Sequence, residues 1–94
     1  LNLGYKLYYF RTASGVEGDF VLYGARGIVG LEVKLSSHFN DIMIRGLKNF
    51  AQDYPEARLF LIYTGERKLY IGNVTVLPLT YALHHLPELL SPKI

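Results

Sequence analysis

The sequence contains no cysteine among its 94 residues. This absence excludes a disulfide scaffold, a thiolate zinc site and a cysteine nucleophile, and it fits a reducing intracellular setting. We therefore expect a cytoplasmic protein whose stability comes from side-chain packing.

Charge and long apolar runs are also scarce. The formal net charge is only +2, so binding to nucleic acid would require basic residues gathered on one side of the molecule. The longest apolar stretches, such as residues 59–63, are far shorter than the roughly 20 residues that span a bilayer, and we expect no membrane partner. A phosphate-binding loop ending in Gly-Lys-Ser or Gly-Lys-Thr is absent too, so any ATPase activity would belong to another segment.

What is present favours a single folded domain over residues 1–94. Half of the residues are hydrophobic and 14% are aromatic, which is enough apolar surface for collapse into one core. The chain begins with Leu1 inside a strand-like segment, and this predicts a C-terminal piece of a longer protein.

Hydrophobic patterning predicts an α/β fold. Three strand-like runs open the chain, and a loop with glycine at both ends separates the second from the third; the runs cover residues 6–11, 17–23 and 28–35. An amphipathic helix follows, with Ser36, Ser37 or Asn40 as its N-cap, and ends before Pro55. The expected order is therefore β-β-β-α-β.

The second half predicts one buried strand and a β-rich tail. Residues 57–63 are almost continuously apolar, which is typical of a central strand covered on both faces. Residues 69–77 indicate one or two short strands broken at Gly72-Asn73, and residues 80–86 a short helix ended by Pro87. Together these elements predict a mixed β-sheet with flanking helices.

The predicted hairpin brings four charged residues to one face. If the loop of residues 24–27 closes a regular hairpin, residues whose numbers sum to 51 are opposite each other, so Asp19 faces Glu32 and Glu17 faces Lys34. Carboxylates opposite each other, with Cβ atoms about 5 Å apart, repel unless a cation lies between them, and either Lys34 or Mg²⁺ would supply that charge. The alternative is an ordinary Glu17–Lys34 ion pair, with Asp19 and Glu32 facing water.

The acidic and basic positions also match a known signature. Asp19, twelve residues, then Glu32-Val33-Lys34 resembles the motif of the PD-(D/E)XK superfamily, which includes restriction endonucleases. Longer segments are similar to the domain of unknown function that follows the AAA-type ATPase module in many bacterial and archaeal ATPases; these are residues 8–12, 15–22, 31–34 and 46–50. The likeness continues through residues 71–74 and 76–79.

This resemblance implies a restriction-endonuclease-like sheet whose first helix is missing, and a metal-dependent nuclease. Asp19, Glu32 and Lys34 would be its catalytic residues, with Asp19 and Glu32 binding Mg²⁺ and Lys34 positioning the attacking water. No tightly bound cofactor is expected, and the implied partners are DNA and the ATPase module of the same chain.

The site so implied is incomplete, which leaves other functions open. A further acidic residue from a helix before the first strand often completes such sites, and the chain begins after that point. The alternative is a non-catalytic regulatory or interaction module of the same fold. Self-association through an exposed strand edge at residues 5–10 is a third hypothesis.

Other candidate residues have ordinary structural explanations. Glu17 is a candidate extra ligand, His38 a candidate base, and His84 and His85 are adjacent and so cannot share one metal as a helical i, i+4 pair would. Basic side chains would contact phosphates only if clustered; these are Arg45, Lys48, Arg58, Arg67 and Lys68. Aromatic side chains near the start would either stack on bases or pack in the fold; these are Tyr5, Tyr8, Tyr9 and Phe10.

Overall fold

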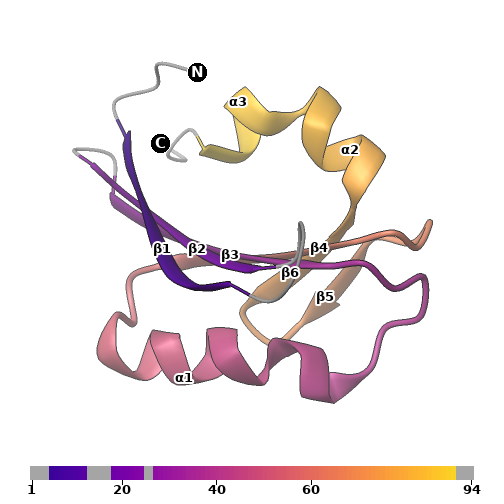
Figure 1. The fold of residues 1–94 in the computed structure, drawn as a ribbon, viewed down its shortest axis with the longest axis horizontal. Coiled ribbons are helices and arrows are strands. Elements are labelled where there is room, and N and C mark those ends of the chain that lie inside the picture. The colour runs from indigo at the N-terminus through magenta and orange to yellow at the C-terminus, as the bar shows by residue number, and fades with distance from the viewer. Residues whose placement is uncertain (1–4, 13–17, 25–26, 91–94) are drawn as a thin grey trace.

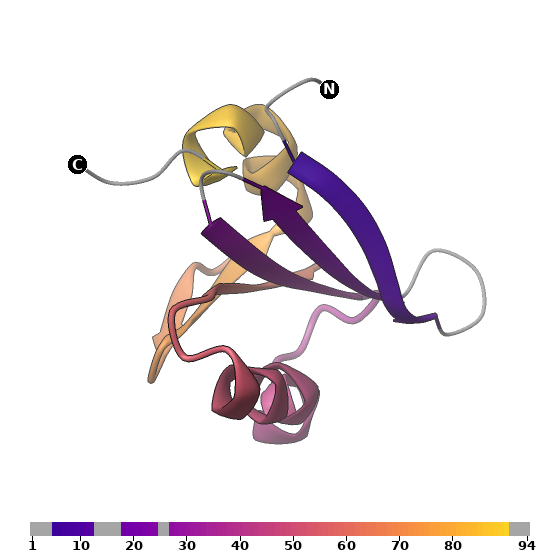
Figure 2. The same ribbon diagram turned by 90° about the vertical axis from the view of Figure 1, so that its left-hand side faces the viewer.

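The molecule is built on one mixed sheet. The computed structural model of the chain describes the backbone of residues 5–12, 18–24 and 27–90, and the side chains of Val21 and of residues 27–89. Within these ranges the strands form a six-stranded sheet in the order β1-β2-β3-β4-β6-β5, and helices lie against both of its faces (Figures 1 and 2). The predicted α/β fold, a mixed sheet with flanking helices, is confirmed.

An antiparallel meander forms one side of the sheet. It consists of β1 (Tyr5–Thr12), β2 (Gly18–Gly24) and β3 (Gly27–Lys34). The β2–β3 register pairs each residue from 18 to 24 with the one whose number completes 51, as the sequence predicts. Gly27 closes this register with a φ of 114°, a conformation that glycine adopts without strain. Glu17 is outside the described residues, so its pairing with Lys34 stays a prediction.

A helical crossover joins β3 to its parallel neighbour β4 (Arg58–Tyr63). The crossover contains a 3₁₀ helix, η1 (Asp41–Ile44), and then α1 (Arg45–Asp53), which ends before Pro55 as predicted. Of the three candidate N-caps, Asn40 acts as the cap: its Oδ1 accepts a hydrogen bond of 3.0 Å from the Ile42 N–H. The single helix expected from the sequence is thus a 3₁₀ turn followed by an α-helix.

The strand β4 lies in the middle of the sheet, between β3 and β6, and every residue after Arg58 is buried. Its predicted central position is confirmed. Beyond it, β5 (Leu69–Ile71) and β6 (Val74–Pro78) form an antiparallel pair, with β6 parallel to β4. Gly72 turns the chain between them with a φ of +61°.

Two short helices end the described chain, α2 (Leu79–His84) and α3 (Leu86–Leu90). The short helix expected over residues 80–86 is present as α2, but the expectation that Pro87 ends it is wrong, because α2 ends at His84 and Pro87 is the second residue of α3. Proline is tolerated in a first helical turn, where its missing N–H has no intrahelical acceptor to lose. Pro87 therefore helps begin a helix here.

The sheet separates two apolar clusters. On the face covered by η1 and α1, buried side chains from β3, β4, β6 and both helical segments pack together; these are Ile28, Ile44, Leu47, Phe50, Leu59, Leu61, Tyr63, Val74 and Val76. On the opposite face, Val29, Phe60 and Leu77 pack beneath α2 and α3, with Leu31, Tyr81, Leu86 and Leu89 against them. This two-sided burial holds β3 and β4 rigidly in the sheet.

None of the described helices is long and apolar enough to span a lipid bilayer. That finding agrees with the short apolar runs of the sequence.

Candidate functional site

Glu32 is a buried carboxylate in the middle of the sheet. It is 3% exposed and is the charged residue among the buried side chains of the described part of the chain. Its place follows from strand alternation: Ile28 packs in the α1-side cluster, and a Cβ at Gly30 would lie 3.2 Å from Leu59 on that side. Glu32 belongs to the same face, the one against which α1 and η1 pack. Burial of an ionised carboxylate is costly unless a cation or hydrogen bonds compensate it.

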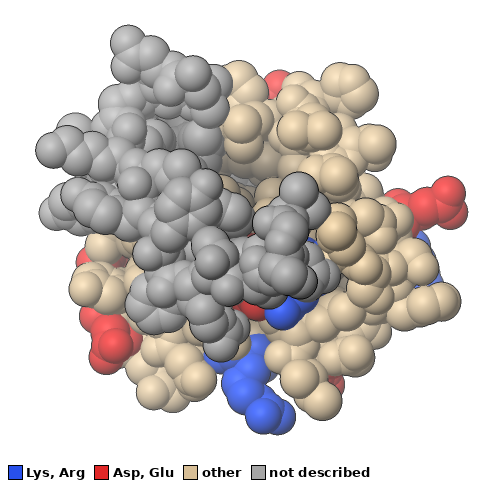
Figure 3. Space-filling model, viewed as in Figure 1, with Lys and Arg blue, Asp and Glu red and all other residues tan. Residues whose placement is uncertain are grey.

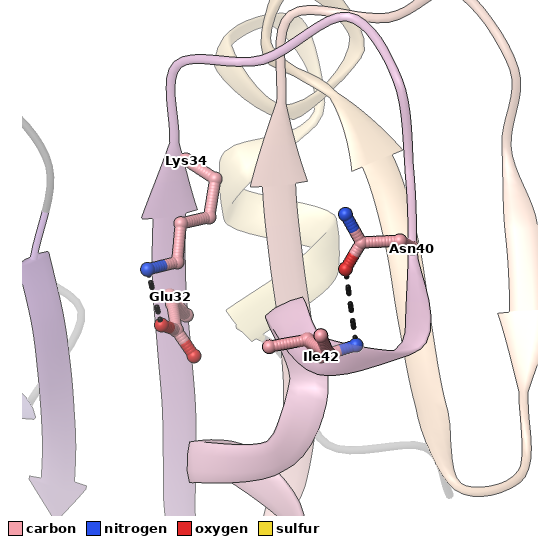
Figure 4. A network of polar contacts seen from close by, with 4 residues as sticks. All are labelled: Glu32, Lys34, Asn40 and Ile42. Atoms are coloured by element: carbon pink, nitrogen blue, oxygen red, sulfur yellow. Dashed lines mark hydrogen bonds and ion pairs between the residues drawn. The ribbon is translucent and has the colours of Figure 1, made fainter.

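Lys34 supplies such a cation. Its Nζ lies 3.3 Å from Oε2 of Glu32, and the two side chains lie next to each other on β3 (Figure 4). Lys34 is 30% exposed, so its amine reaches the pair from the solvent side. Of the two counter-charges that the sequence leaves open for the hairpin carboxylates, Lys34 or Mg²⁺, the structure places Lys34 beside Glu32.

Asp19 is the backbone partner of Glu32 across the hairpin. The two Cα atoms are paired in the β2–β3 register, while Leu61 of β4 is the partner of Glu32 on the other side. Directly paired positions in an antiparallel ladder share one face of the sheet. The side chain of Asp19 is outside what the structure describes, so the predicted meeting of the two carboxylates rests on the register.

The residue types at these two paired positions are ones that a hard divalent cation takes as ligands. Carboxylate oxygens are the ligands that Mg²⁺ takes in proteins, commonly one or two per ion with water completing the shell. Asp19 and Glu32 provide that number on neighbouring strands. Within the described residues, no cluster of three or more His, Cys, Asp or Glu side chains adds a further ligand.

The predicted basic residues do not form one patch. Arg58 and Lys68 line the same pocket on the α2–α3 face, whereas Arg67 lines a different pocket, and Arg45 and Lys48 are exposed on α1. On the face drawn in Figure 3, described basic side chains occupy small areas with acidic side chains to either side. These five candidates therefore offer phosphates separate local contacts.

The three histidines have different environments. His38 is exposed after β3, and its backbone N–H donates a hydrogen bond of 3.3 Å to the Ser36 hydroxyl. His84 is exposed at the end of α2, while His85 stacks on Tyr81 with ring centroids 4.1 Å apart. That the adjacent pair does not share a metal stays a prediction.

A pocket of about 640 Å³ lies where β3 and β4 end. The loops that follow the two strands line it, with His38 on one side and Glu66 and Arg67 on the other. The Thr64 N–H donates to the Ser36 carbonyl at 3.0 Å and so holds these loops together. Crevices at the carboxyl ends of parallel strands are frequent ligand sites in α/β proteins.

Sequence reasoning missed a second pocket, of about 470 Å³, on the α2–α3 face. Its lining includes Lys68, Tyr70, Tyr81 and His85, which come from two separate segments of the chain. The available signals were the i, i+2 spacing of Lys68 and Tyr70 and the i, i+4 spacing of Tyr81 and His85. Only the fold shows that these pairs meet.

Comparison with known proteins identifies the family. No curated protein and no solved structure shows significant similarity to this chain. One protein family, described as a domain of unknown function (DUF4143), matches residues 1–82. This match covers most of the chain, and the chain therefore belongs to the DUF4143 family.

Proposed function

We propose that this protein is the nuclease-like domain of an AAA-type ATPase, of the PD-(D/E)XK type, and that it acts on DNA through a Mg²⁺ site at Asp19, Glu32 and Lys34. The observation that carries the proposal is the buried Glu32 carboxylate, paired in register with Asp19 and lying 3.3 Å from the Lys34 amine. The link to an ATPase module rests on the resemblance of the longer segments to domains that follow such modules.

The chemistry follows from the residue types. A Mg²⁺ ion held by the two carboxylates would lower the pKa of a bound water and neutralise charge on the phosphate. Glu32 suits the ligand role because its covered position holds the carboxylate in one orientation. Lys34 suits a role on the substrate side, because its partly exposed amine can donate a hydrogen bond to a water or to a phosphate oxygen.

The alternative is a non-catalytic module of the same fold that regulates or docks the ATPase part. The observation that favours it is the Glu32–Lys34 ion pair itself, since Lys34 already provides the positive charge that a buried carboxylate requires. The placing of Arg58 and Lys68 in one pocket and of Arg67 in another also favours a protein partner over a long stretch of nucleic acid. In this case the charged pair would be structural.

Metal titration separates the two functions. Backbone amide shifts would be followed by NMR as Mg²⁺ or Mn²⁺ is added to the wild type, Asp19→Ala and Glu32→Gln, with Asp53→Asn as the control. Asp53 is exposed at the end of α1, so its loss should leave any hairpin site intact. The nuclease-like function predicts shifts in β2 and β3 of the wild type and of the control, and none in the two site variants.

A second experiment tests catalysis. The full-length protein would be incubated with DNA and Mg²⁺, alongside its Lys34→Gln variant. Cleavage that is lost in Lys34→Gln while the metal-dependent shifts persist would support Lys34 as a catalytic residue. Absence of both metal-dependent shifts and cleavage would overturn the nuclease function and leave the interaction module.

A further inference from the structure

The pocket on the α2–α3 face has an ordered floor. Phe60 of β4, Thr75 of β6 and Tyr70 of β5 lie in one row across three strands, because Thr75 is the register partner of both others. Phe60 packs in the cluster beneath α2 and α3, so this row faces those helices. Tyr81 and His85 line the pocket from the helical side. The site therefore lies across the sheet from Glu32, on the upper side in Figure 1.

An amine is held at this pocket by aromatic rings. The Lys68 Nζ lies 4.8 Å from the centroid of the Tyr81 ring and 5.5 Å from that of Tyr70. It also donates a hydrogen bond of 3.4 Å to the Tyr81 hydroxyl. A lysine on an open surface samples many rotamers, whereas two ring faces restrict this one. The positive charge is thus placed beside the pocket before any ligand binds.

The other charges in the lining leave a surplus of positive charge. Arg58 contributes a second cation, whose Nη1 donates a hydrogen bond of 2.9 Å to the Leu89 carbonyl and so joins β4 to α3. Glu88 is the one carboxylate among the described residues that line the pocket. Hydrogen bonding to Tyr70 and then to Tyr81 raises the pKa of Lys68, so its amine is charged at neutral pH.

Aromatic surface is available next to this charge. The Tyr70 side chain is 68% exposed, so one face of its ring can accept a planar group. The volume of about 470 Å³ falls within the range of small-molecule sites, and Phe60 and Leu89 supply apolar lining. Asn73 and Thr75 add neutral hydrogen-bonding groups. A simple anion would leave the aromatic walls unused, and an apolar ligand would leave Lys68 unused.

We propose that this pocket binds a nucleoside phosphate, with the base against Tyr70 and the phosphate at Lys68. Base stacking on tyrosine and a lysine contact to phosphate are the two interactions that such a ligand needs, and this pocket contains both. The ligand is either a free nucleotide or the terminal nucleotide of a strand, since both present the same groups. The site is on the opposite face from Asp19 and Glu32 and does not depend on their function.

NMR titration of the 94-residue chain would test the site with four probes: AMP, a short 5′-phosphorylated oligonucleotide, adenosine and inorganic phosphate. We expect AMP or the oligonucleotide to shift amides of residues 68–75 and 81–89. Adenosine and phosphate alone should bind at least about tenfold more weakly, because each provides one of the two interactions. Tighter binding of AMP would identify a free nucleotide, and tighter binding of the oligonucleotide a strand end.

Variants make the test specific. Lys68→Gln and Tyr70→Ala should each weaken binding by about tenfold or more, while Lys48→Gln should leave it unchanged. Lys48 is a matched control because it is an exposed lysine on α1, across the sheet from the pocket. Circular dichroism of each variant would confirm that the fold is retained. Equal effects of Lys68→Gln and Lys48→Gln, phosphate binding as tight as AMP, or no shifts at millimolar probe would overturn the proposal.

Discussion

Lys34 and Glu32 form an ion pair along a single strand, two residues apart, with 3.3 Å between the amine nitrogen and Oε2. The two members differ in environment, since the carboxylate is 3% exposed and the lysine 30%. The lysine therefore acts as the partly solvated counter-charge of a covered acid. This difference in exposure determines how substitution of Lys34 or Glu32 should change the free energy of unfolding.

Removal of the lysine should destabilise the fold more than removal of an ordinary surface lysine. We expect Lys34→Met to lower the free energy of unfolding by about 1–3 kcal/mol, because the covered carboxylate loses its counter-charge. Lys48→Met on the exposed face of α1 should stay within about 0.5 kcal/mol of the wild type. Urea unfolding of both variants is the measurement.

A double-mutant cycle isolates the pair. Glu32→Gln and Lys34→Met together should cost less than the sum of the single changes, by about 1–2 kcal/mol, because the neutral amide no longer requires the amine. Additive effects of the two substitutions would show that the contact contributes nothing to stability.

The start of the crossover should depend on one side-chain oxygen. Asn40→Ala removes the acceptor of the Ile42 N–H (Figure 4), and we expect a loss of about 1 kcal/mol in unfolding free energy. Asn49→Ala is the control, since Asn49 is exposed inside α1 and alanine favours helices. Thermal or urea unfolding measures both. An Asn40→Ala protein as stable as Asn49→Ala would contradict the capping role.

Any side chain at Gly65 should destabilise the fold. A Cβ there would lie 2.7 Å from the Ser37 carbonyl oxygen and nearer still to the Tyr63 ring, so Gly65→Ala must displace backbone or a buried ring. We expect a loss of about 1–3 kcal/mol. The Tyr63 hydroxyl donates to the Arg67 carbonyl at 2.6 Å and accepts from the Arg67 N–H at 3.2 Å, and both bonds should weaken as the ring moves.

The matched control for Gly65 is Gly72→Asn. Nothing lies within 4 Å of a Cβ at Gly72, and asparagine tolerates its left-handed φ of +61°. Urea unfolding should show a smaller loss there, and hydrogen exchange of the Arg67 amide should rise only in Gly65→Ala. If Gly65→Ala changed neither the unfolding free energy nor the exchange of the Arg67 amide, the two loops after β3 and β4 would not be closely packed.

The Lys68 amine should titrate above its ordinary value of 10.5, because hydrogen bonding to Tyr70 first and Tyr81 second raises its pKa. A raised pKa in the folded state means that the stabilisation is complete below pH 10.5 and is lost as the pH rises through the folded pKa. The lysine is exposed, so the effect on unfolding should be small.

Substitution of the hydroxyl groups tests the cause of that shift. Tyr70→Phe and Tyr81→Phe keep the rings and remove the oxygens, so each should lower the pKa of Lys68 toward 10.5. The measurement is the ¹³Cε shift of Lys68 across the alkaline range. An unchanged titration in both variants would show that the ring faces alone set the behaviour of the amine.

Local rules were enough for the hairpin. The loop between Gly24 and Gly27 has a fixed length, and side chains alternate along strands, so the pairing of Asp19 with Glu32 followed from the sequence alone. The central place of β4 is likewise predictable, because a continuous apolar run is a local signal. For the helix start, capping chemistry narrows the choice to Ser36, Ser37 and Asn40, and the structure decides for Asn40. The metal site at Asp19 and Glu32 stays a prediction.

Tertiary structure decided what the local rules left open. Pro87 begins a helix instead of ending one, because the chain turns at His85 and leaves the proline in a first turn. Lys68, Tyr70, Tyr81 and His85 meet only because β5 pairs with β6 and α2 folds back over the sheet.

The burial of Glu32 shows the division most clearly. Strand alternation assigns Glu32 to one face of the sheet. It does not predict which of the two faces α1 covers, because an exposed face and a covered face show the same alternation. Strand alternation and the β2–β3 register depend on residues that are close together in the sequence, so the sequence by itself determines them. Burial and the pocket were decided by contacts between segments far apart in the chain, since solvent exclusion depends on every element packed nearby.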